Sequence, residues 1–177
     1  MHRGMGLLVA LIVGAMALPS EGSAQFRPWQ ISIAGGPSFP RGELADEADT
    51  GYHVQGSIGV DFPLLPIGVR ADALWQEYPD VHDDWVRQLG ALANVTVGMP
   101  MLLIQPYALV GAGLIRTKLG EEHGGETDTN AGFNAGVGLD FGFLGLGGFV
   151  EARFLNLLGG GEAKNRQGIP ISAGIRF

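Results

Sequence analysis

Residues 169–177 read IPISAGIRF and alternate between two kinds of side chain. In an extended chain, one face would carry Ile169, Ile171, Ala173, Ile175 and Phe177, and the other would carry Pro170, Ser172, Gly174 and Arg176. A period of two residues is the pattern of a β-strand with two different faces. The stretch therefore predicts a strand that ends on an aromatic residue.

The same alternation recurs along most of the chain before this stretch. It is clear in Tyr52–Phe62, Ile67–Tyr78, Arg87–Met99 and Phe133–Phe141, and weaker in Trp29–Phe39, Gln105–Thr117 and Gly147–Leu157. These segments and the last one make eight candidate strands of nine to thirteen residues. A strand that crosses a bilayer at a tilt needs about nine to eleven residues. Helices are disfavoured, because each interior glycine costs a helix about 1 kcal/mol and the chain has 30 glycines.

The connections between these segments alternate in length. Short ones are Pro63–Pro66, Pro100–Ile104 and Gly142–Leu146, and long ones are Ser38–Thr50, Pro79–Trp85, Lys118–Asn130 and Gly159–Gly168. Alternating tight turns and longer loops are typical of outer-membrane barrels. The predicted fold is all-β: an eight-stranded antiparallel up-and-down transmembrane β-barrel with both termini on the short-turn side.

The N-terminus has the pattern of a secretory signal. His2 and Arg3 precede the apolar run Leu7–Leu18, and Gly22-Ser23-Ala24 forms a small-residue cleavage motif. The run is shorter than the roughly 20 apolar residues of a membrane-spanning helix. We therefore expect residues 1–24 to be a cleaved signal peptide and residues 25–177 to form the barrel domain.

Composition excludes several classes of protein. The 177 residues include no cysteine, so neither a disulfide scaffold nor a cysteine zinc site is available. With 46% hydrophobic and 16% charged residues, the chain is too apolar to be disordered. The formal charge of −7 argues against nucleic acid as a partner, since phosphate binding needs basic clusters.

The terminal strand carries a resemblance to a known family. Its face of Ile171, Ala173, Ile175 and Phe177 resembles the last strand of Gram-negative outer-membrane barrels, whose terminal aromatic is the assembly signal. With the signal peptide and eight strands, the chain is similar in plan to the transmembrane domain of outer membrane protein A. The resemblance implies secretion through the inner membrane to the outer membrane, with the barrel assembly machinery, membrane lipid and lipopolysaccharide as partners. It leaves the activity open, because the family includes adhesins, anchors, small pores and lipid A-modifying enzymes.

Aromatic residues gather near the strand ends. Girdles of this kind mark the two interfaces of a membrane barrel, whereas in a soluble barrel the same residues would be core. The residues expected in the girdles are Trp29, Phe62, Trp75, Tyr78, Trp85, Phe141, Phe143, Phe154 and Phe177.

Seven charged residues fall on the polar faces of the strands. The interior of an eight-stranded barrel is just wide enough for side chains to fill, and buried charges must be paired. We therefore expect one network in the lumen, formed by Asp61, Arg70, Asp72, Asp140, Glu151, Arg153 and Arg176. It would act either as a charged plug, the preferred interpretation, or as a gated pore or proton path. Inward glycines are expected to make room for bulky side chains.

Acidic residues concentrate in three long connections. They are Glu43, Asp46, Glu47 and Asp49 in the first, Asp80, Asp83 and Asp84 in the second, and Glu121, Glu122, Glu126 and Asp128 in the third. Carboxylates suit hard divalent cations such as calcium, which could bridge to lipopolysaccharide phosphates. The preferred interpretation is a solvated surface, and no EF-hand spacing is present.

Evidence for catalysis in the sequence is weak. The predicted mature chain has only His53, His82 and His123. His53 shares a face with Ser57, but four residues of strand separate them by about 13 Å. The histidine-x-serine-asparagine pattern of barrel lipid A deacylases is missing. We predict no catalytic, cofactor or metal residues and a structural or surface-interaction role through the acidic loops. A narrow pore is the first alternative, and a lipid A-modifying enzyme is the second.

Overall fold

The computed structural model describes residues 29–42, 44–62, 65–79, 85–99, 104–119, 127–143, 146–158 and 166–177. The predicted signal peptide, residues 1–24, lies outside the described residues. The described chain forms β1 (Trp29–Gly42), α2 (Leu44–Glu47), β2 (Gly51–Asp61), β3 (Ile67–Pro79), β4 (Trp85–Gly98), β5 (Ile104–Leu119), β6 (Thr127–Phe143), β7 (Leu146–Leu157) and β8 (Arg166–Arg176).

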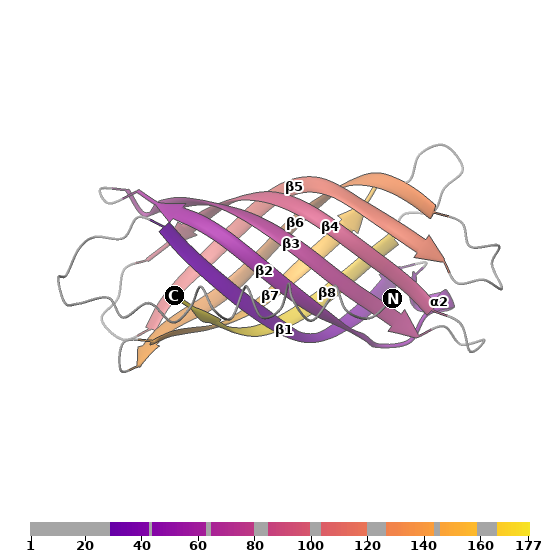
Figure 1. Cartoon of the computed structure of the whole chain (residues 1–177), viewed down its shortest axis with the longest axis horizontal. Coiled ribbons are helices and arrows are strands. Elements are labelled where there is room, and N and C mark those ends of the chain that lie inside the picture. Colours follow the sequence, from indigo (N-terminus) through magenta and orange to yellow (C-terminus); the bar gives the residue numbers. More distant parts are fainter. Residues whose placement is uncertain are drawn as a thin grey trace, which may run out of the picture.

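The strands form one closed barrel. Each pairs antiparallel with the next along the chain, and β8 pairs with β1 at the seam, where Ile33 lies opposite Ile175. Figure 1 shows the strands winding obliquely around a common axis. Closure leaves no unpaired sheet edge. The structure confirms the predicted all-β, eight-stranded antiparallel up-and-down barrel.

Several strands are longer than the sequence pattern suggested. The connection expected over Lys118–Asn130 is shortened from both sides, because Lys118 of β5 still pairs with Thr127 of β6. Similarly, β1 continues past Ser38 to Gly42, which lies opposite Arg166 of β8. Polar residues here obscure the alternation of apolar and polar side chains. Backbone pairing between the strands continues all the same, and at β6 the preference of threonine for strands favours it.

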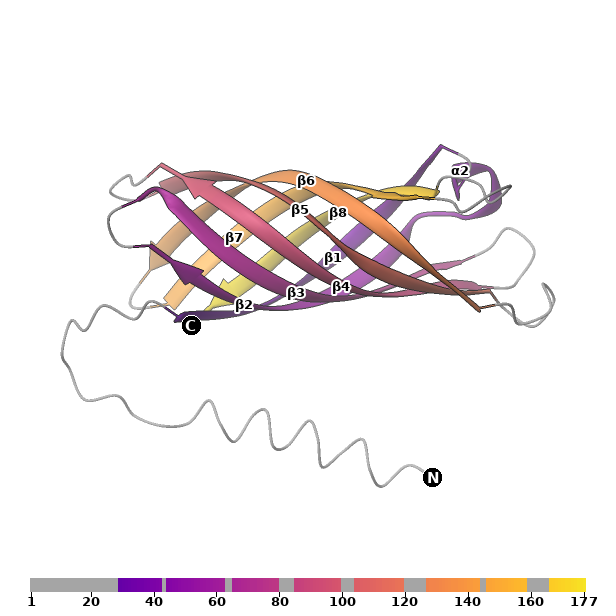
Figure 2. The same ribbon diagram turned by 90° about the horizontal axis from the view of Figure 1, so that it is seen from above.

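The two ends of the barrel differ. One end, here called the short-turn end, holds the start of β1 and the end of β8, and the short connections join strands there. The other, the long-loop end, carries α2 and the longer connections (Figure 2). No helix among the described residues is long and apolar enough to cross a membrane.

The outside of the barrel is apolar. Along β4, Leu89, Val95 and Val97 are exposed, whereas the alternate residues Gln88 and Asn94 are buried inside. The same alternation holds on the other strands. In the part described, outward-facing strand positions carry charge only near the long-loop end, so an uncharged band covers the rest of the outer wall.

The aromatic residues follow the expected positions with one exception. On the outward side, Trp29, Phe62, Phe141, Phe154 and Phe177 are exposed, and Trp75 and Trp85 are half-buried. The side chain of Phe143 lies outside the described residues. The placement of Tyr78 in a girdle is wrong: it is fully buried in the barrel, where its hydroxyl lies 2.7 Å from Oγ of Ser38. Its face is fixed by the two-residue period, which it shares with Leu74 and Gln76.

The interior is filled in layers toward the long-loop end. An apolar cluster there consists of Leu74, Leu92, Ile115, Leu155 and Leu157. Beyond it, Leu44 and Ala48, in and after α2, pack on Tyr78 and Val86. The helix therefore covers this end of the lumen.

Close packing inside depends on glycine at two positions. A Cβ on Gly138 would overlap the ring of Tyr107, and one on Gly136 would lie 2.9 Å from Cγ of Arg153. The expectation that inward glycines make room for bulky side chains is confirmed at both residues.

Candidate functional site

The centre of the lumen is crossed by four charged residues, here called the central charge network. Arg70 and Asp72 come from β3, and Glu151 and Arg153 come from β7 on the opposite wall. Each arginine contacts both carboxylates: Arg70 lies 3.0 Å from Asp72 and 2.8 Å from Glu151, and Arg153 lies 2.7 Å from Asp72 and 2.5 Å from Glu151. All four are less than 8% exposed. The formal charges cancel within the network.

Two neutral residues also bond to the carboxylates. Asn94 donates to Asp72 over 2.8 Å, and the hydroxyl of Tyr107 donates to Glu151 over 2.7 Å. The arginine contacts with Glu151 are aligned hydrogen bonds, whereas those with Asp72 are close ion pairs without that alignment. Buried ions are tolerated when partners replace lost water, and here each carboxylate has three.

The remaining predicted lumen charges lie nearer the short-turn end. Arg176 contacts Asp140 over 2.7 Å, and its guanidinium carbon lies 5.0 Å from the centroid of the Phe149 ring. Asp61 accepts a hydrogen bond from the side chain of Gln30. A single network of all seven charges stays a prediction. Asp61 is the last residue of β2, at the barrel rim, and lies opposite Gly68, two residues along β3 from Arg70.

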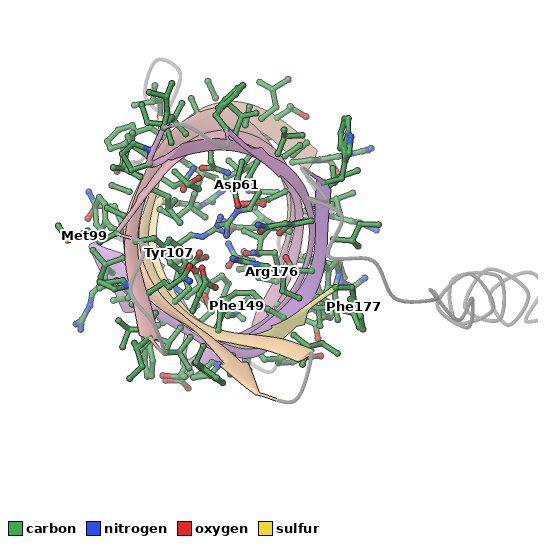
Figure 3. The ribbon with its side chains drawn as sticks, turned by 90° about the vertical axis from the view of Figure 1, so that its left-hand side faces the viewer. Asp61, Met99, Tyr107, Phe149, Arg176 and Phe177 are labelled. Carbon is green, nitrogen blue, oxygen red and sulfur yellow. The ribbon has the colours of Figure 1, made fainter. Side chains whose placement is uncertain are left out.

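A cavity of about 550 Å³ opens toward the short-turn end. Asp61, Asp140 and Arg176 line its wall, and Arg70 and Tyr107 also line it. Figure 3 looks into this end, with Asp61, Tyr107, Phe149 and Arg176 inside the ring of strands. The cavity thus reaches the central charge network from one side.

Side chains fill the lumen on the other side of the network. The apolar cluster around Leu74 and Ile115 is followed by a chain of hydrogen bonds in which Ser38 donates to Gln76 and Gln76 donates to Gln88. Leu44 of α2 is only 1% exposed above this layer. The arrangement separates the cavity from the long-loop end.

Sequence reasoning missed a histidine–serine pair that lies in the lumen. Nε2 of His53 on β2 is 2.8 Å from Oγ of Ser172 on β8, and both residues are less than 3% exposed. The structure agrees with the expected separation of His53 from Ser57, since the side chain that donates to Ser57 is Gln55. Only the strand order could have revealed the pair, since β1 lies between β2 and β8. The pair is sealed inside the barrel.

The predicted assembly residues share one surface. Ile171, Ala173, Ile175 and Phe177 are all exposed on the outward face of the terminal strand. Phe177 also closes the seam, exchanging backbone hydrogen bonds of 2.8 and 3.3 Å with Ile31. Figure 3 shows Phe177 outside the barrel wall.

Most of the predicted loop acids lie outside the described residues or have side chains that do. This is true of Glu43, Asp46, Glu47, Asp80, Asp83, Asp84, Glu121, Glu122 and Glu126, and of His82 and His123. Asp49 and Asp128 are described and are exposed. Within the described ranges, no group of three histidines, cysteines or acids could hold a metal ion.

Solved structures share this fold at low sequence identity. Neisserial surface protein A matches with a TM-score of 0.68 and 14% identity, over 85% of this chain and 96% of that chain. Ail, the attachment invasion locus protein of Yersinia pestis, matches with a TM-score of 0.55 and 16% identity over 84% and 97%. This chain has the fold of the small eight-stranded outer-membrane barrels. No protein-family model and no curated protein sequence matches it.

The same fold also carries catalysis. The outer membrane enzyme PagL matches with a TM-score of 0.54 and 15% identity, over 84% of this chain and 98% of that chain. At these identities the similarity concerns the fold alone, and function has to be argued from the residues of this chain.

Proposed function

We propose that this chain is a non-catalytic barrel of the bacterial outer membrane, with a sealed lumen and with long loops that carry its interactions. The filled lumen is the observation that carries the proposal. The central charge network crosses it, and the cluster around Leu74 and Ile115 fills the next layer. An eight-stranded barrel packed in this way acts as a rigid membrane anchor for its loops.

The outer wall supports placement in a membrane. Its uncharged band is what lipid requires of a barrel surface, since charges there cost about 2–4 kcal/mol at the bilayer midplane. The proposed partners are outer-membrane lipid and lipopolysaccharide, with divalent cations bridging between loop acids and lipid phosphates. The barrel assembly machinery would recognise the strand that ends at Phe177.

Fractionation combined with a heat-modifiability gel tests this placement. The protein should be found in the outer-membrane fraction and should migrate faster unboiled, because the closed sheet resists detergent. Recovery of the folded protein in the soluble periplasmic fraction would contradict the proposal.

A narrow pore is the second candidate function, favoured by the cavity of about 550 Å³ that reaches Arg70. Planar bilayers separate the two. A sealed barrel gives no stable conductance, whereas a large ohmic conductance from the purified protein would establish the pore.

A lipid A-modifying activity is tested by mass spectrometry of lipid A from cells with and without the protein. The proposal expects identical spectra. The His53–Ser172 pair is buried in the lumen, away from the outward surface where a membrane lipid would lie.

A further inference from the structure

The charges on the outer wall are confined to one level and are mostly basic. Among the described strand residues, outward positions carry charge only at Arg41, Glu77, Arg87, Arg116 and Lys118. Four of these five are cations, although the whole chain has a formal charge of −7. The net charge of the outer wall is therefore positive, whereas that of the whole chain is negative.

Three of the cations lie side by side on β4 and β5, and we call Arg87, Arg116 and Lys118 the cation cluster. Arg87 pairs with Lys118 in the ladder, and Arg116 lies two residues away on the same face. Both Arg87 and Lys118 approach the indole of Trp85, with Cζ 4.4 Å and Nζ 5.6 Å from its centroid. Cation–π attraction holds the two charges close together.

A neighbouring carboxylate orients one member of the cluster. Nε and Nη2 of Arg87 donate to Oε2 of Glu77 over 2.9 and 2.7 Å, and Tyr52 donates to Oε1 over 3.2 Å. Glu77 balances one of the three positive charges. Two positive charges remain on an exposed surface.

The cluster stands directly above the apolar band. Leu89 lies opposite Arg116 in the ladder and is 56% exposed, and Leu114 is 60% exposed. Trp75 and Trp85 are half-buried at the same level as the cations, where amphipathic rings mark the boundary between hydrocarbon and headgroups. A lipid with its chains on Leu89 would bring its headgroup to Arg116.

We propose that the cation cluster binds the phosphate groups of an outer-leaflet lipid whose chains lie along Leu89 and Leu114. The inference rests on the proposed placement in the outer membrane. A guanidinium offers paired donors that match phosphate oxygens. The negative charge of the whole chain disfavours soluble polyanions, whereas a lipid phosphate is delivered to this level by the membrane itself.

The test uses the full folded protein in detergent micelles, titrated with bisphosphorylated lipid A and with the same lipid after removal of both phosphates. The variant is Arg116→Gln with Lys118→Gln, which leaves the Arg87–Glu77 pair intact. The matched control is Arg41→Gln, an outward cation at the same end of the barrel on the opposite wall. Inorganic phosphate is added as a competitor.

Each basic residue near a lipid surface contributes about fivefold in affinity, so the double variant should bind bisphosphorylated lipid A about thirtyfold more weakly. Arg41→Gln and millimolar inorganic phosphate should leave the affinity unchanged. Equal binding of the two lipids, or an equal loss in the control, would overturn the inference. Competition by inorganic phosphate would instead identify an anion site without lipid specificity.

Heat modifiability of each variant is measured in parallel to show that the barrel is folded. The barrel should stay folded, because the substituted side chains of Arg41, Arg116 and Lys118 are all exposed. A protein that inserts into membranes but binds both lipids equally refutes the lipid site alone. A protein that does not insert refutes the proposed membrane function.

Discussion

The hydroxyl of Tyr107 donates a 2.7 Å hydrogen bond to Oε2 of Glu151, joining β5 inside the lumen to β7, the next strand but one. Both residues are less than 9% exposed, so water does not readily replace this bond. Tyr107 also lines the cavity that opens at the short-turn end. It therefore connects the wall of the cavity to the central charge network.

Tyr107→Phe should destabilise the folded barrel by about 1.5–3 kcal/mol, the usual value for a hydrogen bond to a charged group. The measurement is the temperature at which the unboiled gel band disappears. Tyr52→Phe is the matched control, because its hydroxyl bonds Glu77 on the exposed outer wall. An equal loss of stability in both variants would show that the hydrogen bond in the lumen stabilises the barrel no more than the exposed one.

Arg70→Ala should be more severe, because it leaves the buried carboxylates of Asp72 and Glu151 with one arginine between them. Breaking such a buried pair costs about 3–5 kcal/mol. Arg87→Ala breaks an exposed pair with Glu77, where the contribution is about 0–1 kcal/mol. Comparison of urea midpoints tests the difference, and equal midpoints for the two variants would contradict a structural role for the network.

The period of two residues was enough to predict the eight strands and most of their faces, and the alternating connection lengths added the closed barrel. It was also enough to place Arg70, Asp72, Glu151 and Arg153 inside, because each lies on the polar face of a long strand. The level of each charged residue along the barrel axis was not predictable. It depends on register and on barrel shear, which bring β3 opposite β7 and leave Asp61 at the rim.

The same limit explains the partners that sequence reasoning missed. His53 and Ser172 are 119 residues apart, and the bond between them depends on β1 lying between their strands. The cation cluster was hidden for another reason. Arg87 and Arg116 lie at the ends of predicted strands and Lys118 lies in a predicted connection, and the pairing of β5 with β4 shows that the three meet on one outward face.

Deletion of Phe177 should reduce the amount of folded protein in the outer membrane, with the unassembled chain degraded. The residue is exposed on the outer wall, and its backbone pairs with Ile31 at the seam. Phe177→Ala separates the two roles, since it removes the ring and keeps the backbone bonds. Trp29→Ala is the control, an aromatic at the same end that is 62% exposed. Normal folded levels of Phe177→Ala would count against the assembly signal.

Protease added to intact cells should cut the long connections near Glu43–Asp49 or Gly120–Asp128 and spare the short turns. The even number of strands puts the start of β1 and the end of β8 at one end of the barrel, and the closed sheet agrees with this. If Phe177 is the assembly signal, that end faces the periplasm, and the long-loop end with its exposed Asp49 and Asp128 faces outward. Small and polar loop residues are the preferred sites of nicking.

The informative digest compares intact with permeabilised cells and maps each cut by mass spectrometry. Cuts within the two long connections should appear in both samples, because these connections face the medium. The turn Pro63–Pro66 has two prolines and no charge, so it is a poor substrate even when accessible. A tag inserted there should therefore be detected only after permeabilisation. Detection of that tag on intact cells would invert the topology, and the cation cluster would then face the inner leaflet, where it could not meet an outer-leaflet lipid.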